Sequence, residues 1–304
     1  MKLQINAAKL SSAIADGRGR GVGDEYTPWI QIRRSTSSPF SNQSIWRLPG
    51  MRRASHFLSR GEREIATIVS FAGATDIREQ YPLFAWPHPH PADEIQGVNS
   101  NSPHIGMERI AAEAGIKLAH YPRTKIPVVL TIDLMVTLPE RDTSKDQLLG
   151  ISCKPRQGRN GGYPLRVLER LELDRRYCAR ADIRHLLLHP EMFPRDLSAS
   201  LTWISPDSHR NAWGAIRKSS TYLDFVDRVG RKAYERPPYL VVEKAATRLS
   251  IPSAQAGEFL KIALWNQDLD VDLNCRLSMS SPFRPGGRAM KTLLASMLFG
   301  RRDA

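Results

Sequence analysis

A near-continuous apolar stretch at residues 126–138 constrains the fold of this chain more than any other feature. Runs of this kind are typical of central strands that are covered on both faces, so the stretch predicts an α/β architecture. Asp133 interrupts it. An isolated carboxylate in such a strand costs several kcal/mol unless it is protonated, paired or bound to a cation. A divalent metal is the economical partner; a salt bridge to an arginine, or a place at the exposed end of the strand, is the alternative.

A second short strand is predicted at 148–154, where it ends at Lys154-Pro155 because proline stops further pairing. Ser152 and Lys154 then share one face. If the two strands are neighbours, their period of two brings Asp133, Ser152 and Lys154 to the same side of the sheet.

A helix is predicted to begin after Ser59 as N-cap, with Glu62 three residues on. Ile65, Ile68, Val69 and Ala72 form its buried stripe up to Gly73. Glu62 has two interpretations: it completes a capping box with Ser59, or it faces Asp133 across the predicted sheet. Residues 76–84 follow as a strand, in which Arg78 and Gln80 either line a DNA path or simply stabilise the strand.

Together these residues indicate the geometry of a restriction-endonuclease-like site. In such a site carboxylates hold one or two Mg2+ ions, and a lysine steadies the attacking water or the developing negative charge. The chemistry is phosphodiester hydrolysis. An aspartate, a spacer of about twenty residues and a lysine form a weak pattern by themselves, because it recurs by chance in chains of this length.

The charge balance favours a polyanionic partner. The 304 residues carry a net charge of +13, with 33 arginines against 11 lysines, and arginine suits bidentate contacts to phosphate. A merely basic protein and an acidic membrane surface are the competing explanations. Three widely spaced cysteines argue against a disulfide framework or zinc knuckle, and no stretch is apolar enough to span a bilayer. A cytoplasmic protein is therefore expected.

The rest of the chain changes character several times. Residues 1–58 are predicted to form a basic arm that docks locally, and residues 85–125 a loop-rich excursion in which His88 and His90 are not expected to bind metal. A helix at 164–180 is predicted, with Leu165, Leu168 and Leu171 on one stripe, followed by a strand at 183–188. Beyond residue 195 the chain turns helical and basic, with Leu269, Val271 and Leu273 alternating with acids as a half-exposed strand.

Ordered landmarks add a family resemblance. They are Gly17-Arg18-Gly19-Arg20-Gly21, Tyr26, Pro28-Trp29, His56-Phe57-Leu58-Ser59 before Glu62, the run 76–83, Thr131-Ile132-Asp133, Ile151-Ser152-Cys153-Lys154-Pro155 and the helix 168–177. In this order they closely resemble the TnsA family, the endonuclease subunits of heteromeric bacterial DNA transposases. One departure is Ser152, where the family commonly has glutamine, a ligand through its side-chain oxygen. Metal could instead be held through water or the Cys153 carbonyl.

The resemblance implies a restriction-endonuclease-like core at 59–195, a mixed sheet flanked by helices, after the arm at 1–58. A smaller helical domain of winged-helix type follows at 196–304, for partner and DNA contacts. It implies catalysis by Glu62, Asp133 and Lys154, and Mg2+, or Mn2+ in its place, on Glu62, Asp133 and Ser152. The implied partners are transposon-end DNA, a transposase cutting the 3′ strand and a regulatory AAA+ ATPase, in the bacterial cytoplasm at the nucleoid and without a membrane.

Two other functions fit the same residues. A stand-alone restriction or repair nuclease would cut DNA without partners. A non-catalytic DNA-binding assembly subunit, with a decayed nuclease site and Ser152 as the symptom, would support recruitment only.

Overall fold

The computed structural model describes residues 7–33, 42–95, 103–139, 148–156 and 162–300. Its elements are α1 (Ala7–Ala15), η1 (Gly23–Glu25), β1 (Ser44–Trp46), β2 (Ser55–Phe57), α2 (Arg60–Ala72), β3 (Asp76–Leu83), α3 (Met107–Glu113), β4 (Leu130–Thr137), β5 (Leu148–Cys153), α4 (Leu165–Arg180), β6 (Arg184–Leu188), η2 (Pro190–Met192), α5 (Arg195–Trp203), α6 (Arg210–Lys218), α7 (Ser220–Gly230), α8 (Pro238–Leu249), α9 (Ser253–Asn266) and α10 (Gly287–Phe299).

These elements fall into two compact units. The first comprises Met1–Trp46, Arg53–Ala66 and Ala74–Pro190, and the second Arg47–Arg52, Thr67–Gly73 and Glu191–Ala304. The two units are described separately, and the domain boundaries expected from the sequence stay predictions.

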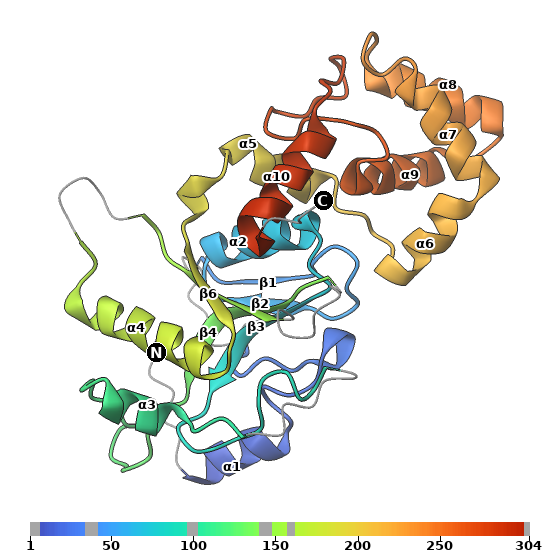
Figure 1. Cartoon of the computed structure of the whole chain (residues 1–304). Coiled ribbons are helices and arrows are strands. Elements are labelled where there is room, and N and C mark those ends of the chain that lie inside the picture. The colour runs from blue at the N-terminus through green and yellow to red at the C-terminus, as the bar shows by residue number, and fades with distance from the viewer. Residues whose placement is uncertain (1–6, 34–41, 96–102, 140–147, 157–161, 301–304) are drawn as a thin grey trace. The chain divides into compact units, whose positions relative to one another are not determined.

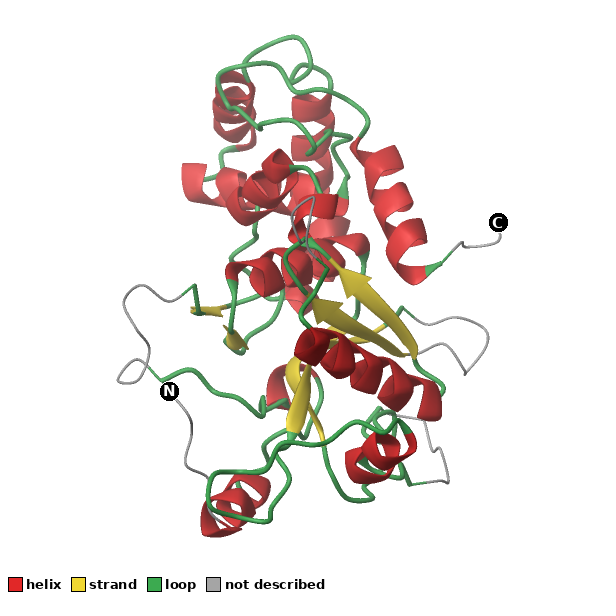
Figure 2. Ribbon diagram, turned by 90° about the vertical axis from the view of Figure 1, so that its left-hand side faces the viewer, coloured by secondary structure: helices red, strands yellow, loops and turns green. Residues whose placement is uncertain are grey.

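A four-stranded mixed sheet, in the order β3-β4-β5-β6, forms the centre of the first unit (Figure 1). β4 pairs antiparallel with β3 and β5, whereas β6 runs parallel to β5. A parallel pair needs a crossover connection, and α4 supplies it. Figure 2 shows α4 lying across one face of the sheet. The predicted α/β class with a mixed sheet flanked by helices is confirmed, and it is compatible with a nuclease-like core.

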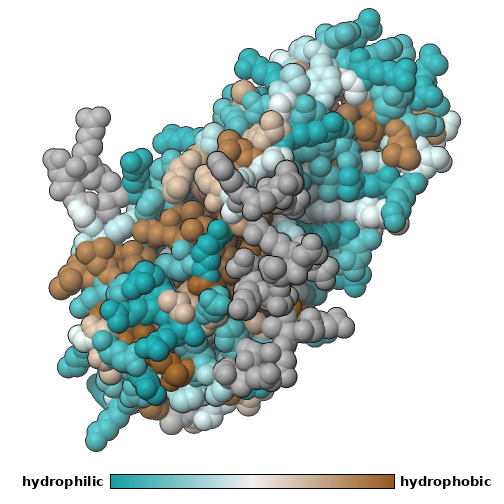
Figure 3. Space-filling view, in the orientation of Figure 1, coloured by the Kyte–Doolittle hydropathy of each residue, from teal (hydrophilic) through white to brown (hydrophobic). Residues whose placement is uncertain are grey.

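The core under α4 corrects one expectation from the sequence. The helix packs through its C-terminal half, where Leu173, Tyr177 and Cys178 are buried against the sheet and α3. Leu165 and Leu168, on the predicted stripe, are 73% and 48% exposed, and an apolar surface lies over α4 in Figure 3. The helix was predicted correctly from the apolar spacing, but Leu165 and Leu168 lie on the first turns of α4, before the half that packs on the sheet.

The N-terminal segment packs on β3. The Tyr26 hydroxyl donates to the Glu79 carbonyl at 3.0 Å, and the Trp29 amide donates to the Gln80 carbonyl at 3.3 Å. Gly19 adopts φ +79°, and a side chain there would overlap the ring of Pro82. Glycine is required at this position both for the left-handed backbone and for the close approach of the two segments.

β3 carries charges that are fully buried and paired. Arg53 forms a 2.8 Å ion pair with Glu79, whose side chain is inaccessible to solvent. Arg78 is equally buried, donates to the Pro91 carbonyl at 3.1 Å and approaches Glu94 at 3.5 Å. The sequence left open whether Arg78 lines a DNA path. Its burial assigns it to holding the loop after β3 against the strand.

The second unit is helical throughout its largest described stretch. Residues 191–300 form α5–α10 and no strand, so a winged-helix domain, which needs a strand pair for its wing, stays a prediction. Tyr222, Phe225 and Phe259 form an aromatic cluster with ring centroids 5.3–5.7 Å apart.

The strand predicted around Leu269, Val271 and Leu273 is wrong. These three residues are buried, but the segment is a loop, two of whose acids bind residues of other helices. Asp268 pairs with Arg217 at 2.6 Å, and Asp270 accepts the Arg288 amide in the first turn of α10 at 2.7 Å. The alternation of apolar and acidic residues therefore belongs to a loop. One of its acids accepts a backbone amide that would otherwise lack a partner at the start of α10.

Within the residues described, no helix is both long and apolar enough to cross a bilayer.

Candidate active site

The candidate site lies where β4 and β5 separate. Backbone pairing between these strands runs from Thr137↔Leu148 to Leu134↔Ile151, whereas β5 stays paired with β6 as far as Cys153↔Leu188. Continued register would place Asp133 opposite Ser152. Instead, the Asp133 carboxylate accepts the Cys153 amide at 2.6 Å. The side chain thus satisfies a backbone donor that the neighbouring strand would otherwise take.

Asp133 and Lys154 form the charged pair of this opening. Lys154 Nζ lies 3.0 Å from Asp133 Oδ2 and also donates to the Cys153 carbonyl at 3.0 Å. Their side chains are 15% and 27% exposed, so both are reachable from solvent. Burial acts to lower the pKa of Lys154, but the adjacent Asp133 outweighs it and the pKa is raised. The lysine is therefore held as a cation at the strand end.

Glu62 reaches the same place from the first turn of α2. Ser59 caps the helix through its hydroxyl, which accepts the Glu62 amide at 3.1 Å, and the Glu62 carboxylate accepts the Leu58 amide at 2.9 Å. Burial, followed by the negative charge of Asp133, raises the pKa of Glu62 to about 7. Both interpretations of Glu62 apply: it completes the helix cap, and it lies within electrostatic reach of Asp133.

Gln80 holds Glu62 from the neighbouring strand β3. It stands opposite Asp133 in the β3–β4 register, between the pairs Glu79↔Leu134 and Tyr81↔Ile132. Its amide nitrogen donates to Glu62 at 3.0 Å, and its amide oxygen accepts the Thr131 hydroxyl at 3.1 Å. Gln80 has φ +49°, a left-handed conformation that is strained for a residue other than glycine. The strained residue is therefore the one whose side chain orients the Glu62 carboxylate.

Ser152 points to a different group of residues. It is fully buried, donates to Asp174 of α4 at 2.9 Å and lies 2.9 Å from His185 Nε2. Burial raises the pKa of Asp174 to about 6, although Arg170 pairs with it through a short contact. Burial also lowers the pKa of His185 to about 4. The structure brings Glu62, Asp133 and Lys154 together, whereas the Ser152 hydroxyl is engaged by the α4 and β6 side chains.

The residues at the opening fit a hard divalent cation. The negative charge of Asp133 raises the free energy of the charged form of Glu62, and a cation between the two acids relieves this repulsion. Mg2+ is commonly held by one or two carboxylates with water completing its shell. Within the described ranges no group of three or more His, Cys, Asp and Glu side chains is arranged for metal binding. A cation here would need oxygen from water or from the backbone, such as the Cys153 carbonyl, in addition to the two acids.

The histidines of the Pro-rich loop have structural partners. His88 contacts the Trp86 carbonyl and the Tyr177 hydroxyl, both at 2.8 Å, and His90 contacts the Ala181 carbonyl at 2.9 Å.

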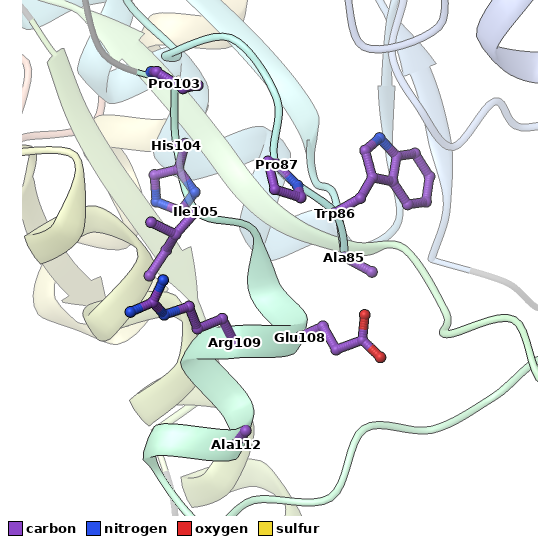
Figure 4. A pocket seen from close by; sticks show the side chains of 9 residues that line it. All are labelled: Ala85, Trp86, Pro87, Pro103, His104, Ile105, Glu108, Arg109 and Ala112. Carbon is purple, nitrogen blue, oxygen red and sulfur yellow. The ribbon is translucent and has the colours of Figure 1, made fainter.

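A cavity of about 550 Å³ opens beside this loop, lined by Trp86, His104 and the α3 residues Glu108 and Arg109, among others. Figure 4 shows these α3 side chains below the loop residues. None of the residues predicted for catalysis lines it.

The chain is similar to a transposition protein. Transposon Tn7 transposition protein TnsA of Escherichia coli is 28% identical over 203 residues, which cover 66% of this chain and 63% of TnsA. No protein-family model matches the chain. The similarity supports a distant relationship to TnsA-like proteins, and the match spans less than two thirds of TnsA itself.

Sequence reasoning left the role of Gln80 open and missed Asp174 and Arg170. A signal for the last two was present, because Arg170 and Asp174 are four residues apart and share one helix face. The sequence gave no local signal for the role of Gln80, since that role depends on a left-handed backbone and on the first turn of α2, which lies near Gln80 in space.

Proposed function

We propose that this chain is the metal-dependent DNA endonuclease subunit of a transposase, which hydrolyses the 5′-strand phosphodiester at transposon ends. The observation that carries the proposal is the convergence of Glu62, Asp133 and Lys154 where β4 and β5 separate. The similarity to the transposition protein TnsA supports the transposition context.

Each residue has a role that its contacts support. Glu62 and Asp133 would hold Mg2+, or Mn2+ in its place, at two carboxylates that are already oriented by Leu58, Gln80 and Cys153. When bound, the cation polarises the scissile phosphate and lowers the pKa of a water. Lys154, kept cationic by Asp133, steadies the attacking water or the negative charge that develops on the phosphate.

Ser152 is the weakest member of the proposed ligand set. Its hydroxyl is bonded to Asp174, so it would have to leave that partner or act through water. We retain it as a proposed ligand on the basis of its position beside Cys153.

The proposed partners follow from the transposition context. A second transposase subunit would cut and join the 3′ strand, an AAA+ ATPase would regulate the assembly, and a winged-helix-type fold in the second unit would serve these contacts. The whole assembly would act on DNA in the bacterial cytoplasm.

The test is reconstitution. Donor DNA carrying the cognate ends is incubated with the partner proteins and Mg2+, with and without this chain, and the cuts on each strand are mapped. Cuts on the 5′ strand that need this chain and Mg2+ support the proposal. Cuts by the purified chain alone indicate a stand-alone nuclease, and 5′ cuts without the chain contradict the proposal.

Metal binding is measurable without partners. Calorimetric titration of Mn2+ into the purified chain should give binding that is lost in Asp133→Ala. Thermal unfolding should shift upward with metal, because a ligand that binds only the folded state stabilises it.

One observation favours a second candidate, a non-catalytic assembly subunit. The Ser152 oxygen is held by Asp174 on the α4 side of β5, which leaves the cation fewer ligands than a glutamine at that position would provide. This candidate predicts unchanged transposition products after Lys154→Ala and lost recruitment when the second unit is removed.

A further inference from the structure

A basic cavity lies between α7 and α8 of the second unit, remote in sequence from every residue of the proposed nuclease site. Its volume is about 380 Å³. Its lining includes six cations and one acid: Arg228, Arg231, Lys232, Arg236, Lys244, Arg248 and Asp227. All six cations are exposed, and the surface over α7 and α8 is mostly hydrophilic (Figure 3). This density of one sign of charge on a concave surface needs an explanation.

Ion pairs with neighbouring acids do not explain the cluster of cations. Arg231 forms a 3.0 Å ion pair with Asp227. Within the part of the chain that the structure describes, the other five cations of the cavity form no ion pair. Like charges gathered in this way repel one another, so the arrangement is unfavourable for the isolated protein.

The helix dipole explains only part of the cluster. Arg228 lies in the last turn of α7 and Arg248 in the last turn of α8, where cations are favourable. Lys232 and Arg236 lie in the turn between the helices, and Lys244 lies inside α8. These three have no role in capping a helix.

We propose that this cavity binds the phosphodiester backbone of DNA. Cations stand on both walls: Arg228 and Arg231 at the end of α7, and Lys244 and Arg248 one turn apart on α8, about 6 Å along the axis. Two charged walls suit a linear polyanion that passes along the groove. Arginine in addition offers a planar fork of donors that matches phosphate oxygens.

The choice of DNA as the polyanion rests on the proposed function. The competing occupant is an acidic peptide, for which the apolar lining residues Leu240, Val241 and Ala245 would be suited. The exposed position of all six cations favours the phosphate backbone of DNA, because phosphate groups lie on the outside of the duplex and can be contacted by side chains that remain at the protein surface. The peptide is therefore an outcome of the test.

The experiment measures binding of the full chain to a short duplex without transposon-end sequence. Fluorescence anisotropy is recorded in EDTA, so that no cutting occurs, over a series of salt concentrations. The cluster variant is Lys232→Gln/Arg236→Gln/Lys244→Gln. The control variant, Lys117→Gln/Lys125→Gln/Arg195→Gln, removes the same charge from exposed positions elsewhere. A third variant, Lys232→Arg/Arg236→Lys/Lys244→Arg, keeps the charge.

The cluster variant should bind about 10-fold or more weakly at low salt, and the slope of log affinity against log salt should fall in magnitude by about 2–3, as expected for three lost phosphate contacts. The control and the charge-retaining variant should keep most of the wild-type slope. Equal slopes for the cluster and control variants would overturn the proposal. Unchanged DNA binding with lost binding of poly-glutamate would overturn it in favour of an acidic peptide.

Failure of the nuclease assignment would look different. Cutting by Asp133→Ala in the assembled system with Mg2+ tests the nuclease assignment, and this readout is separate from duplex binding in EDTA, which tests the basic cavity. If Asp133→Ala still cuts while the cluster variant loses DNA binding, the nuclease assignment fails and the DNA-binding cavity stands.

Discussion

The two sides of the end of β5 hold acids of similar electrostatic character but different surroundings. Burial raises the pKa of Asp174 to about 6 and that of Glu62 to about 7. Asp174 is fully engaged, with Arg170 on one oxygen and Ser152 on the other. Glu62 faces a second acid, Asp133, which is reachable from solvent.

The difference teaches how to separate a structural acid from a candidate ligand. A raised pKa marks both, because desolvation is the first cause in each case. The charge of Asp133 acts on both acids, but Asp174 has Arg170 as a partner, whereas Glu62 and Asp133 lie at an opening between strands. Perturbed pKa values are found in functional sites and in structural ion pairs alike. Geometry, rather than the pKa shift, decides which acid can take a cation.

After Asp133→Ala, the largest loss of cutting is expected from Lys154→Met, which keeps the aliphatic bulk and removes the charge. Strand-resolved cutting in the assembled system should fall about 10²- to 10³-fold, the loss that follows removal of one group stabilising developing charge. Lys125→Met, at an exposed position, is the control and should cut normally. Equal cutting by both variants would remove Lys154 from the site.

Substitution of Asp174, the acid on α4, should lower the stability of the protein rather than its cutting activity. Asp174→Ala leaves Arg170 without its buried partner, and the free energy of unfolding should fall by about 3 kcal/mol or more. Urea denaturation measures it, with the exposed acid Glu108→Ala as control. Cutting per folded molecule should stay within about threefold of wild type, a free-energy difference smaller than about 1 kcal/mol. A large loss of cutting with full stability would place Asp174 among the ligands.

Gln80 tests whether the strained strand residue orients Glu62. Gln80→Ala removes the amide, and cutting should fall about 10-fold, the equivalent of one hydrogen bond to a charged group. Gln80→Gly removes the amide and also relieves the left-handed strain. The two variants should lose activity alike and require more Mn2+ for half-maximal cutting. Recovery in Gln80→Gly alone would show that backbone strain, not the amide, is what matters.

The smallest effect is expected on the exposed stripe of α4. Leu168→Ala should change the free energy of unfolding by less than about 0.5 kcal/mol, as for other surface substitutions. Leu173→Ala, on the packed half, should cost about 2–5 kcal/mol. Thermal or urea unfolding of the pair measures the contrast, and a costly Leu168→Ala would mean that the stripe is covered in solution.

Much of the first unit follows from its sequence. The apolar run at 126–138 gives β4, the Ser59–Glu62 spacing gives the start of α2, and Lys154-Pro155 marks the end of β5. These elements have strong local signals: continuous burial, a capping side chain and a residue that cannot donate to the next ladder. The α/β class could be predicted for this reason, whereas the grouping of Glu62, Asp133 and Lys154 needed the family resemblance as well, because the spacing alone is a weak pattern.

The features that could not be predicted from the sequence depend on contacts between segments far apart in the chain. Ser152 and Lys154 were placed on one face by strand period, but Asp133 takes the Cys153 amide, and Ser152 turns its hydroxyl to Asp174. The alternation of side chains between two faces holds only while β4 and β5 stay paired, and their pairing stops before Asp133 and Ser152. The acids at 268–272 gave a strand pattern for a similar reason, since their partners lie on other helices.

The most direct test of the account is strand-resolved cutting of donor DNA by the full assembly with Mg2+, comparing wild type with Asp133→Ala. The account predicts that Asp133→Ala abolishes cuts on the 5′ strand and leaves cuts on the 3′ strand in place, because Asp133 joins Glu62 and Lys154 at the opening between β4 and β5. Normal 5′ cutting by Asp133→Ala would contradict it.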